Sequence, residues 1–412
     1  MDTDVKSAAP LQDWHQTVTG GKYIRMLQRH VQSLRAADAH GNRRLFLDDV
    51  VIAHLLAFFN PTLRSLRTIE DFSRSRQAQR HLSVPRLPKS SLSDFHRLAD
   101  PELLQPILHA LRAEIAKCGK RPLPADLQQI VGQVLAVDGS FFALTSRVLW
   151  ALSRRGVNGP KRKGARLNAH LDIATWVPEV LNISGAGLSE AQSAMQHIRP
   201  DAIYLYDRGI FSFELVQAQH DQGARFVHRL REPGERCPQF LVETECTLSD
   251  EDRAAGVLSD RLGRLAGSPG RPAPDLLLRE VIVSSPEEPE RTVRLLTNVL
   301  DVEASVIGAL YRYRWQVELF FRWLKTVAHF RHLISESPAG IQLSFYVALI
   351  GVLLMYLHSG ARPSKYAYSL LSLVASGAAT LEEIAPILAE RERKVALDRA
   401  SQARRKAARK MA

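Results

Sequence analysis

Cysteine is scarce in this chain of 412 residues, and its scarcity excludes one class of protein. The three cysteines, Cys118, Cys237 and Cys246, cannot form the paired framework of a disulfide-rich secreted domain. Cys237 and Cys246, with His228 upstream, also match no spacing of a structural zinc site. We therefore expect a protein of a reducing compartment.

Long apolar runs are also missing. The longest, residues 345–357, is too short to span a bilayer and indicates a buried helix. The first residues, Met1-Asp2-Thr3-Asp4, lack the apolar core of a signal peptide. We expect a cytoplasmic protein, associated with the bacterial nucleoid, that has no membrane partner.

Acidic residues are fewer than basic ones: the chain has 43 aspartates and glutamates and 55 lysines and arginines, which gives a net charge of +12. This balance favours a polyanionic partner, because basic residues that neutralise phosphates release counterions. A generic basic surface is the alternative. Apolar residues make up 45% of the chain, which is typical of a globular protein.

The first 130 residues have the pattern of short helices. Leu47, Val51, Leu55 and Phe58 recur at helical spacing, and prolines separate the segments that follow. Helices, turns and clustered cations are typical of a helix-turn-helix DNA-binding domain, although a solvated basic face fits equally well. The cations are Arg64, Arg67, Arg74, Arg76, Arg80, Arg86 and Lys89.

Two apolar segments, residues 133–138 and 202–207, each read as a buried strand that ends in an aspartate, Asp138 or Asp207. Around them the pattern predicts two strands within 169–184, a helix at 189–197, a helix at 213–220 and a strand at 225–229. This order predicts an α/β (α+β) fold, a mixed sheet flanked by helices.

The next segment, residues 232–300, is rich in glycine and proline and contains two strand candidates, 277–284 and 292–299. We interpret it as a β-rich insertion. Earlier in the chain, basic residues surround Gly156, Gly159 and Pro160. We expect a loop there that contacts the DNA backbone, through Arg162 and Lys163 in particular, or is merely solvated.

A predicted helix over 304–330 carries the strongest signal. At about 100° per residue, Tyr311, Arg314, Glu318 and Lys325 fall within roughly a 60° arc. Surface ion pairs would be the alternative interpretation. The flanking apolar residues argue against a freely solvated helix, and we expect one of them, Trp315, in the core.

This Tyr-x2-Arg-x3-Glu-x6-Lys pattern resembles the signature of the family-four insertion-sequence transposases of bacteria. The surroundings are similar as well: Val137-Asp138-Gly139-Ser140 resembles the family's first aspartate motif and Asp207-Arg208-Gly209 its second. The resemblance covers about residues 130 to 335.

The resemblance implies an RNase H-like catalytic core in which Asp138, Asp207 and Glu318 are catalytic and hold two Mg²⁺ ions, with Mn²⁺ as an alternative. Tyr311, Arg314 and Lys325 would bind DNA phosphates. The implied function is metal-dependent cleavage at transposon ends and strand transfer into target DNA. The implied partner is double-stranded DNA, terminal inverted repeats and target, bound by a homodimer.

Two other functions are compatible with the sequence: a nuclease of the same fold without strand transfer, and a catalytically silent DNA-binding protein derived from a transposase. Some family members flip a base onto an aromatic residue of the insertion to make a hairpin end. Residues 232–300 hold no Trp and only Phe240 among the aromatic residues, so a hairpin is not favoured.

We expect five segments along the chain: an amino-terminal helical DNA-binding domain (1–130), the first part of the catalytic core (131–231), the β-rich insertion (232–300), the second part of the core with the glutamate helix (301–360), and a helical, basic tail (361–412).

Overall fold

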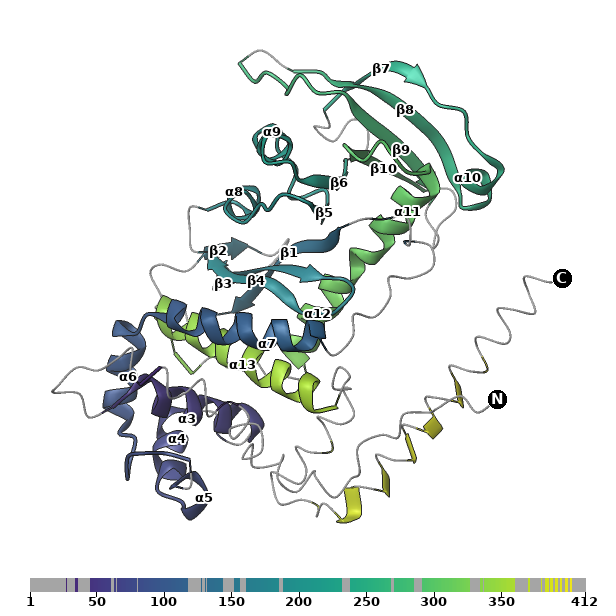
Figure 1. Ribbon diagram of the computed structural model, residues 1–412. Helices are drawn as coiled ribbons and strands as arrows, with labels where there is room; N and C mark the ends of the chain where they lie inside the picture. The colour runs from purple at the N-terminus through teal and green to yellow at the C-terminus, as the bar shows by residue number, and fades with distance from the viewer. Residues whose placement is uncertain are drawn as a thin grey trace. The chain divides into compact units, whose positions relative to one another are not determined.

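The computed structural model divides into two compact units, Met1–Cys118 with Trp323–Ala412, and Gly119–Arg322 (Figure 1). It describes residues 45–359 except 61–62, 64, 80, 118–126, 128–129, 131, 144–151, 156–160, 185–187, 232–237, 268–269, 285–290, 327–333 and 336. Outside this range it describes residues 27, 34–35, 370, 379, 382–384, 386–387, 390–391, 393–394, 397–398 and 401.

The unit of residues 119–322 contains a ten-stranded sheet in the order β2-β3-β1-β5-β6-β10-β9-β8-β7, with β4 beside β3. The strands are β1 (Gln133–Ala143), β2 (Leu152–Arg155), β3 (Lys161–Asp172), β4 (Pro178–Ser184), β5 (Ala202–Tyr206), β6 (Arg225–Arg229), β7 (Phe240–Glu245), β8 (Val257–Leu265), β9 (Leu278–Ser284) and β10 (Thr292–Thr297).

The directions of the central strands identify the fold of this unit. β1, β3 and β4 pair antiparallel, whereas β5 and β6 continue from β1 in parallel. An antiparallel meander whose first strand is extended by two parallel strands is the arrangement of an RNase H-like sheet. The predicted fold class is therefore confirmed.

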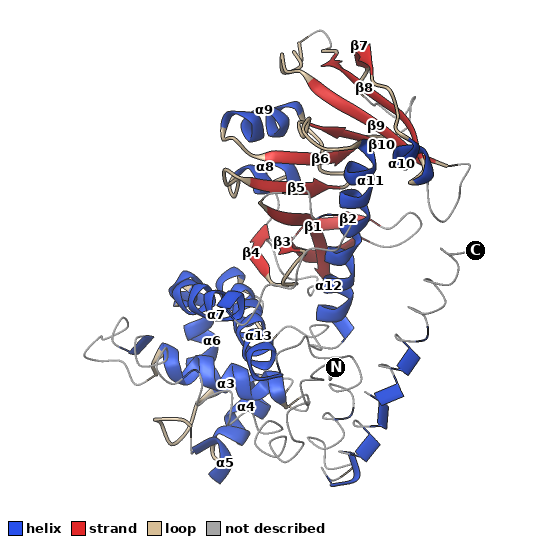
Figure 2. Ribbon diagram, turned by 45° about the vertical axis from the view of Figure 1, so that its right-hand side comes forward, coloured by secondary structure: helices blue, strands red, loops and turns tan. Residues whose placement is uncertain are grey.

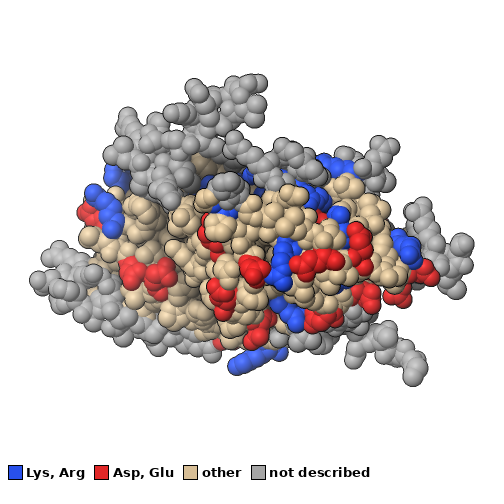
Figure 3. All heavy atoms as spheres, turned by 90° about the horizontal axis from the view of Figure 1, so that it is seen from above, with Lys and Arg blue, Asp and Glu red and all other residues tan. Residues whose placement is uncertain are grey.

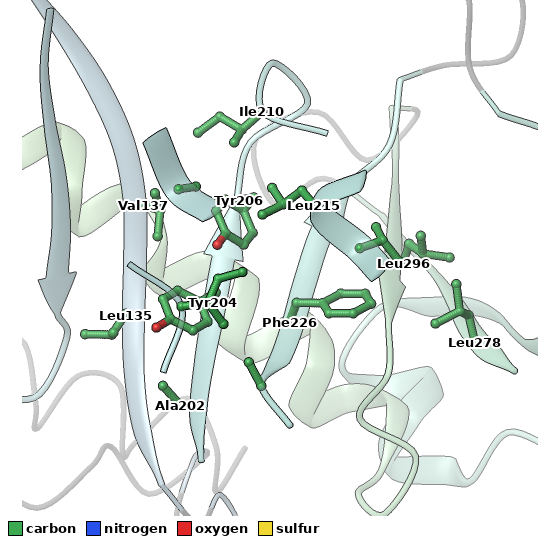
Figure 4. Close-up of a cluster of buried hydrophobic side chains, with 14 of the residues drawn as sticks. Leu135, Val137, Ala202, Tyr204, Tyr206, Ile210, Leu215, Phe226, Leu278 and Leu296 are labelled. Atoms are coloured by element: carbon green, nitrogen blue, oxygen red, sulfur yellow. The ribbon is translucent and has the colours of Figure 1, made fainter. Parts of the chain in front are cut away.

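Apolar side chains on one face of the parallel strands form the core of this unit. Tyr204 and Tyr206 of β5 are completely buried and pack with Leu135, Val137 and Phe226 from the neighbouring strands (Figure 4). The helices α8 (Glu190–Met195) and α9 (Phe213–Asp221) supply the opposing apolar residues. The side chain of Ser189 accepts a hydrogen bond from the Gln192 N–H, so the expected helix start is confirmed.

The β-rich insertion continues the core sheet. Strand β10 pairs with β6 on one side and β9 on the other, and β8 and β7 follow. Strands β9 and β10 match the two predicted strands. The pair β7–β8 and the short helix α10 (Asp250–Ala254) were not predicted.

The predicted helix over 304–330 is two helices, α11 (Ala304–Tyr313) and α12 (Trp315–Thr326), which meet at Arg314. Side chains of the insertion form hydrogen bonds with the backbone at the start of α11. Asp252 of α10 accepts a hydrogen bond from the Ser305 N–H at 2.7 Å, and Arg279 of β9 donates to the Val302 carbonyl at 2.6 Å. The Asp252 carboxylate thus caps α11, because it accepts from an N–H of the first turn that would otherwise have no partner.

The basic residues on either side of the expected loop lie in two strands, while Gly156, Gly159 and Pro160 lie outside the described residues. β2 pairs antiparallel with the first four residues of β3, so that Arg155 lies opposite Lys161 and Arg154 opposite Arg162. The sequence signal failed because strands so rich in cations lack the apolar alternation by which strands are predicted.

The other unit is helical, as predicted for the amino-terminal residues. It contains α3 (Leu47–Phe59), α4 (Leu66–Ser73), α5 (Arg76–Gln79), α6 (Lys89–Leu98), the 3₁₀ turn η2 (Pro101–Leu104), α7 (Gln105–Lys117) and α13 (Pro338–Ser359). The carboxylate of Glu70 accepts hydrogen bonds from the Arg86 side chain and the Lys89 N–H, which ties α4 to the start of α6.

Helix α13 packs against α3, α6 and α7, which lie much earlier in the sequence. We had expected α13 to belong to the same segment as the helix that carries Glu318. Gly351 makes the approach to α3 close, because a Cβ there would stand 2.7 Å from the Phe58 ring. The apolar stretch 345–357 is thus helical, as expected, and its residues 345–351, 353 and 354 are buried. Within the described residues, no helix is long and apolar enough to cross a membrane.

Two buried histidines make the stability of the sheet unit depend on pH. Burial lowers the pKa of His170 in β3 and of His228 in β6 to about 3. In the unfolded chain the pKa returns to about 6.5, so between these values the unfolded state binds more protons. Their contribution to stability is complete above pH 6.5 and is lost as the pH falls toward 3.

We therefore expect the free energy of unfolding to fall by about 1.4 kcal/mol per histidine for each pH unit below 6.5. Urea unfolding at pH 7.5, 6.5 and 5.5 measures this. The double variant His170→Gln/His228→Gln should show a shallower dependence by about two protons. An unchanged slope in that variant would contradict the assignment.

Candidate active site

The two aspartates predicted from the sequence lie side by side where the parallel pairing of β1 with β5 ends. Val137 of β1 and Tyr206 of β5 are partners in the parallel register, and Asp138 and Asp207 each follow directly. Asp207 follows the carboxyl end of β5, an end at which polar groups can face a ligand. The expectation that the other strand ends at Asp138 was wrong, because β1 continues to Ala143. Both aspartates are half-buried.

The surroundings of Asp138 perturb its carboxyl group. Burial raises the pKa of Asp138 to about 6; Glu190 and Glu318 raise it as well, whereas the Gly139 N–H and Arg314 lower it. The Gly139 N–H donates to Asp138 Oδ1 at 2.8 Å. Burial and neighbouring carboxylates disfavour the ionised form of this carboxyl group, and a bound cation would stabilise that form.

Asp207 contacts the signature tyrosine. The Tyr311 hydroxyl donates to Asp207 Oδ1 at 3.2 Å, and Arg229 Nη1 lies 4.0 Å from the same oxygen. Burial, the main cause, raises the pKa of Tyr311 to about 12; Asp207 raises it as well, whereas Arg314 and Arg229 lower it. The phenol therefore stays protonated and serves as a hydrogen-bond donor at neutral pH.

Arg314 stands at the junction of α11 and α12 and is buried. Its Nη2 donates to Glu318 Oε1 at 2.5 Å, and its Cζ lies 5.7 Å from the centre of the Tyr311 ring. Burial opposes its charge, but Tyr311, Asp207 and Glu318 together raise the pKa of Arg314 above its usual value. Its Nε and Nη1 have no hydrogen-bond partner in the described part of the chain.

Glu318 and Lys325 lie seven residues apart on α12 and so on the same face of that helix. The boundary between the two units falls between them, after Arg322. The structure thus brings Asp138, Asp207, Tyr311, Arg314 and Glu318 together in one unit. The cations Arg162 and Lys163 are in β3, and the described side chains do not include them.

The donor chemistry of the site fits a divalent metal, because Mg²⁺ and Mn²⁺ prefer carboxylate oxygens. Among the described residues, however, no three His, Cys, Asp or Glu side chains are close enough together to hold a metal ion. Two of the three carboxylates instead have side-chain partners, Tyr311 on Asp207 and Arg314 on Glu318.

A cavity of about 610 Å³ extends from this cluster toward the insertion. Arg229, Arg314 and Tyr311 line it, together with Arg312 and Ser284. Trp315, expected in the core, lines it too and is 47% exposed. Arg229 was not identified from the sequence; its signal was its place at the end of a predicted strand, β6, which pairs with β5.

Comparison with protein-family models finds a match over the catalytic strands and the signature helices. Residues 130–354 match the family described as "Transposase DDE domain", which is more than half of the chain.

Two curated proteins are similar to this chain. A putative transposase of Sinorhizobium fredii is 28% identical over 220 residues, which cover 53% of this chain and 59% of that protein. A probable transposase for an insertion sequence element of Geobacillus stearothermophilus is 31% identical over 65 residues, 16% of this chain and 17% of that protein. The chain thus spans less than two thirds of the length of either relative.

Among solved structures, the chain aligns with a piggyBac transposase, determined in a synaptic complex with hairpin DNA. The alignment covers 90% of this chain and 80% of the other, with 13% identity and a TM-score of 0.38. The assignment of the fold therefore depends on the strand order described above.

The unpartnered nitrogens of Arg314 lead to a prediction about stability. A buried cation without full pairing costs free energy, and apolar replacements of buried ion pairs are often neutral or stabilising. Arg279 is the matched control, since both side chains are 9% exposed, but Arg279 makes two bonds of 2.8 Å to Asp260, itself buried.

We expect Arg314→Met to leave the free energy of unfolding unchanged or to raise it, because Glu318 stays partly solvated. Arg279→Met should lower it by about 3 kcal/mol, since Asp260 is left buried and unpaired. Urea unfolding of both variants measures the difference. Equal losses would show that Arg314 is a structural residue like Arg279.

Proposed function

Because the chain belongs to the transposase DDE domain family, we propose that it is a DNA transposase that cuts DNA at the ends of its element and joins them to target DNA. One observation supports this most directly. Asp138 lies where the parallel pairing of β1 with β5 ends and Asp207 directly follows β5, with Tyr311, Arg314 and Glu318 beside them.

In this proposal Asp138, Asp207 and Glu318 hold divalent ions, Mg²⁺ or Mn²⁺. Two such ions, when bound, neutralise charge on the attacking and leaving oxygens of a phosphodiester. Tyr311 and Arg314 would then turn from the carboxylates toward DNA phosphates. Nε and Nη1 of Arg314 are buried and have no hydrogen-bond partner among the described residues, so this rotation would free both as donors to the phosphates.

The same reasoning extends to the other cations. Lys325 shares a helix face with Glu318 and would contact phosphates farther along the strand. Arg229 lies 4.0 Å from Asp207 and lines the same cavity as Arg314, so we add it to this set. Arg162 and Lys163 would also contact DNA. The partners would be inverted-repeat ends and target DNA of the bacterial nucleoid, bound by a homodimer.

The carboxylates provide the first test. Asp138→Asn, Asp207→Asn and Glu318→Gln should each abolish cleavage but leave DNA binding, because affinity comes mainly from phosphate contacts. The readout is metal-dependent cleavage and strand transfer of a plasmid that carries the repeats flanking the coding region.

Asp250→Asn is the matched control, since this aspartate is fully exposed on α10, and it should keep full activity. Cleavage without strand transfer by the natural protein would identify a nuclease. Binding without cleavage would identify a silent DNA-binding protein. Near-normal cleavage by Asp138→Asn would remove this aspartate from the mechanism.

A second test compares the two cations of the signature. Arginine offers a planar fork that suits two phosphate oxygens, whereas lysine is a compact, more hydrated charge. We expect Arg314→Lys to slow single-turnover cleavage of bound DNA by roughly tenfold or more, or about 1.4 kcal/mol of barrier. Lys325→Arg should have a smaller effect.

The metal concentration separates two roles of Arg314. If Arg314 only positions Glu318, to which it donates at 2.5 Å, saturating Mg²⁺ or Mn²⁺ should restore the rate of Arg314→Lys. Full restoration would therefore refute a direct phosphate contact. A defect that persists at saturating metal is the expected result.

A further inference from the structure

Helix α6 of the helical unit buries one side and leaves the other side in solvent. Leu92 and His96 are buried, and His96 Nε2 lies 3.0 Å from His54 Nε2 of α3. The helix also packs against α4 and α13. At about 100° per residue, the residues on the opposite side fall within an arc of about 140°. They are Ser90, Ser93, Asp94, Arg97 and Leu98, and we call this set the α6 face.

The side chains of the α6 face are accessible to a partner. Arg97 and Asp94 are 67% and 62% exposed, and Arg97 Nη2 donates to Asp94 Oδ1 at 2.5 Å. An exposed ion pair of this kind contributes little to stability, so both groups can exchange it for other partners at little cost. Leu98 is 80% exposed although it is apolar.

This set of side chains has the chemistry that reads base edges in a major groove. Arginine donates two hydrogen bonds to guanine, aspartate accepts from the amino group of cytosine, and serine contacts several bases. An apolar side chain contacts the methyl group of thymine. Arg97, Asp94, Ser90 and Leu98 supply these four kinds of contact from one side of one helix.

The start of α6 is fixed to α4 by buried groups. The carboxylate of Glu70 accepts hydrogen bonds from Arg86 Nε at 2.7 Å and from the Lys89 N–H at 3.1 Å. The hydroxyl of Ser73 accepts from the Leu87 N–H at 3.0 Å. Glu70 and Ser73 are both buried, so these contacts hold the first turn of α6 in one position.

The turn that precedes α6 is fixed as well. Gln79 Nε2 donates to the carbonyl oxygens of Val84 and Pro85 at 3.1 and 3.2 Å. The carboxylate of Asp49 on α3 accepts from the N–H and the hydroxyl of Ser83 at 2.7 and 2.6 Å. Ser83 and Pro85 are nevertheless exposed. An exposed turn held in this way is preorganised, so little conformational entropy remains to be lost on binding.

Cations lie next to the α6 face. Lys89, the first residue of α6, is exposed, and its side chain forms no ion pair within the described part of the chain. Arg86, three residues earlier, is 52% exposed and is held by Glu70. Arg67 of α4 and Arg76 of α5 are exposed too. Cations beside a reading helix contact phosphates and thereby fix its orientation on a duplex.

The exposed cations of the insertion differ, because they have acidic partners. Arg253 pairs with Asp250, and Arg264 pairs with Glu243 and Asp275. On the face of the molecule seen from above, basic and acidic side chains are intermingled among the described residues (Figure 3). The insertion therefore supplies control residues whose charges are already paired.

We propose that α6 enters the major groove of duplex DNA and reads its sequence through the α6 face, while Arg86 and Lys89 contact phosphates. The ten residues of α6 measure about 15 Å, and the major groove, about 12 Å wide, admits an α-helix. Helices that read DNA in this way follow a turn fixed to a preceding helix. The inference rests on the proposed function and adds to it the element that selects the DNA sequence.

The test begins with the sequence preference of the full chain. Selection from a library of duplexes with a randomised centre, in EDTA, identifies the preferred sequence. Fluorescence anisotropy with this duplex and with a scrambled duplex of the same composition then gives the ratio of the two affinities. Asp94→Asn/Arg97→Gln should lower this ratio by roughly tenfold or more and leave the affinity for the scrambled duplex nearly unchanged.

Asp250→Asn/Arg253→Gln is the matched control, since it removes an exposed ion pair of the same spacing from α10, and it should keep the ratio. Lys89→Gln should lower the affinity for both duplexes equally and reduce the slope of log K against log salt by about 0.9. Ser90→Ala, which removes one hydroxyl from the α6 face, should also lower the ratio and decides the question if the double variant is unstable.

Failure of the two proposals would look different. If the natural protein binds neither duplex, the proposed function fails. If it selects a sequence and the variants of the α6 face keep its ratio, only the proposal for α6 fails. An equal loss of affinity for both duplexes in Asp94→Asn/Arg97→Gln would also overturn it, because contacts to phosphates do not distinguish sequences.

Discussion

The buried guanidinium of Arg314 is the interaction on which the candidate site depends. It donates to Glu318, its charge lowers the pKa of the Asp138 carboxyl group, and Asp207 and Tyr311 are close enough to raise its own pKa. One cation therefore offsets part of the repulsion among three carboxylates that a divalent metal would otherwise relieve. Two of its nitrogens, Nε and Nη1, have no hydrogen-bond partner among the described residues. The structural ion pair Arg279–Asp260 differs, because Nε and Nη2 of Arg279 both donate to Asp260.

The insertion has a role in this arrangement that its position in the sequence does not suggest. Its strands extend the core sheet from β6 outward, so the insertion and the catalytic strands share one hydrogen-bonded framework. Asp252 and Arg279 hold residues 302–305, and α11 carries that constraint forward to Tyr311 and Arg314. Helix α11 contacts β8 and β9 of the insertion and β6 of the core (Figure 2). Residues distant in sequence thus determine where the signature side chains lie.

The elements that could be predicted from the sequence are those whose buried apolar residues form a regular pattern. The strand of Asp207 is completely buried and the strand of Asp138 is buried as far as Val137, so their apolar runs were visible, and both aspartates were located. Strand β7 was missed because nearly all its residues are exposed. Strand β2 and the start of β3 were missed because cations replace the apolar alternation there. The break at Arg314 and the partners of α13 depend on tertiary contacts, which local periodicity does not encode. Arg229 was missed because no motif marks it.

The central claim is that Asp138, Asp207 and Glu318 form a binding site for divalent metal ions. Electron paramagnetic resonance of free Mn²⁺ during titration of the full chain with duplex DNA measures this most directly, since bound Mn²⁺ loses its solution signal. We predict two bound ions per chain, reduced by at least one in both Asp207→Asn and Glu318→Gln and unchanged in Asp250→Asn. Equal Mn²⁺ binding by all four proteins would contradict the account.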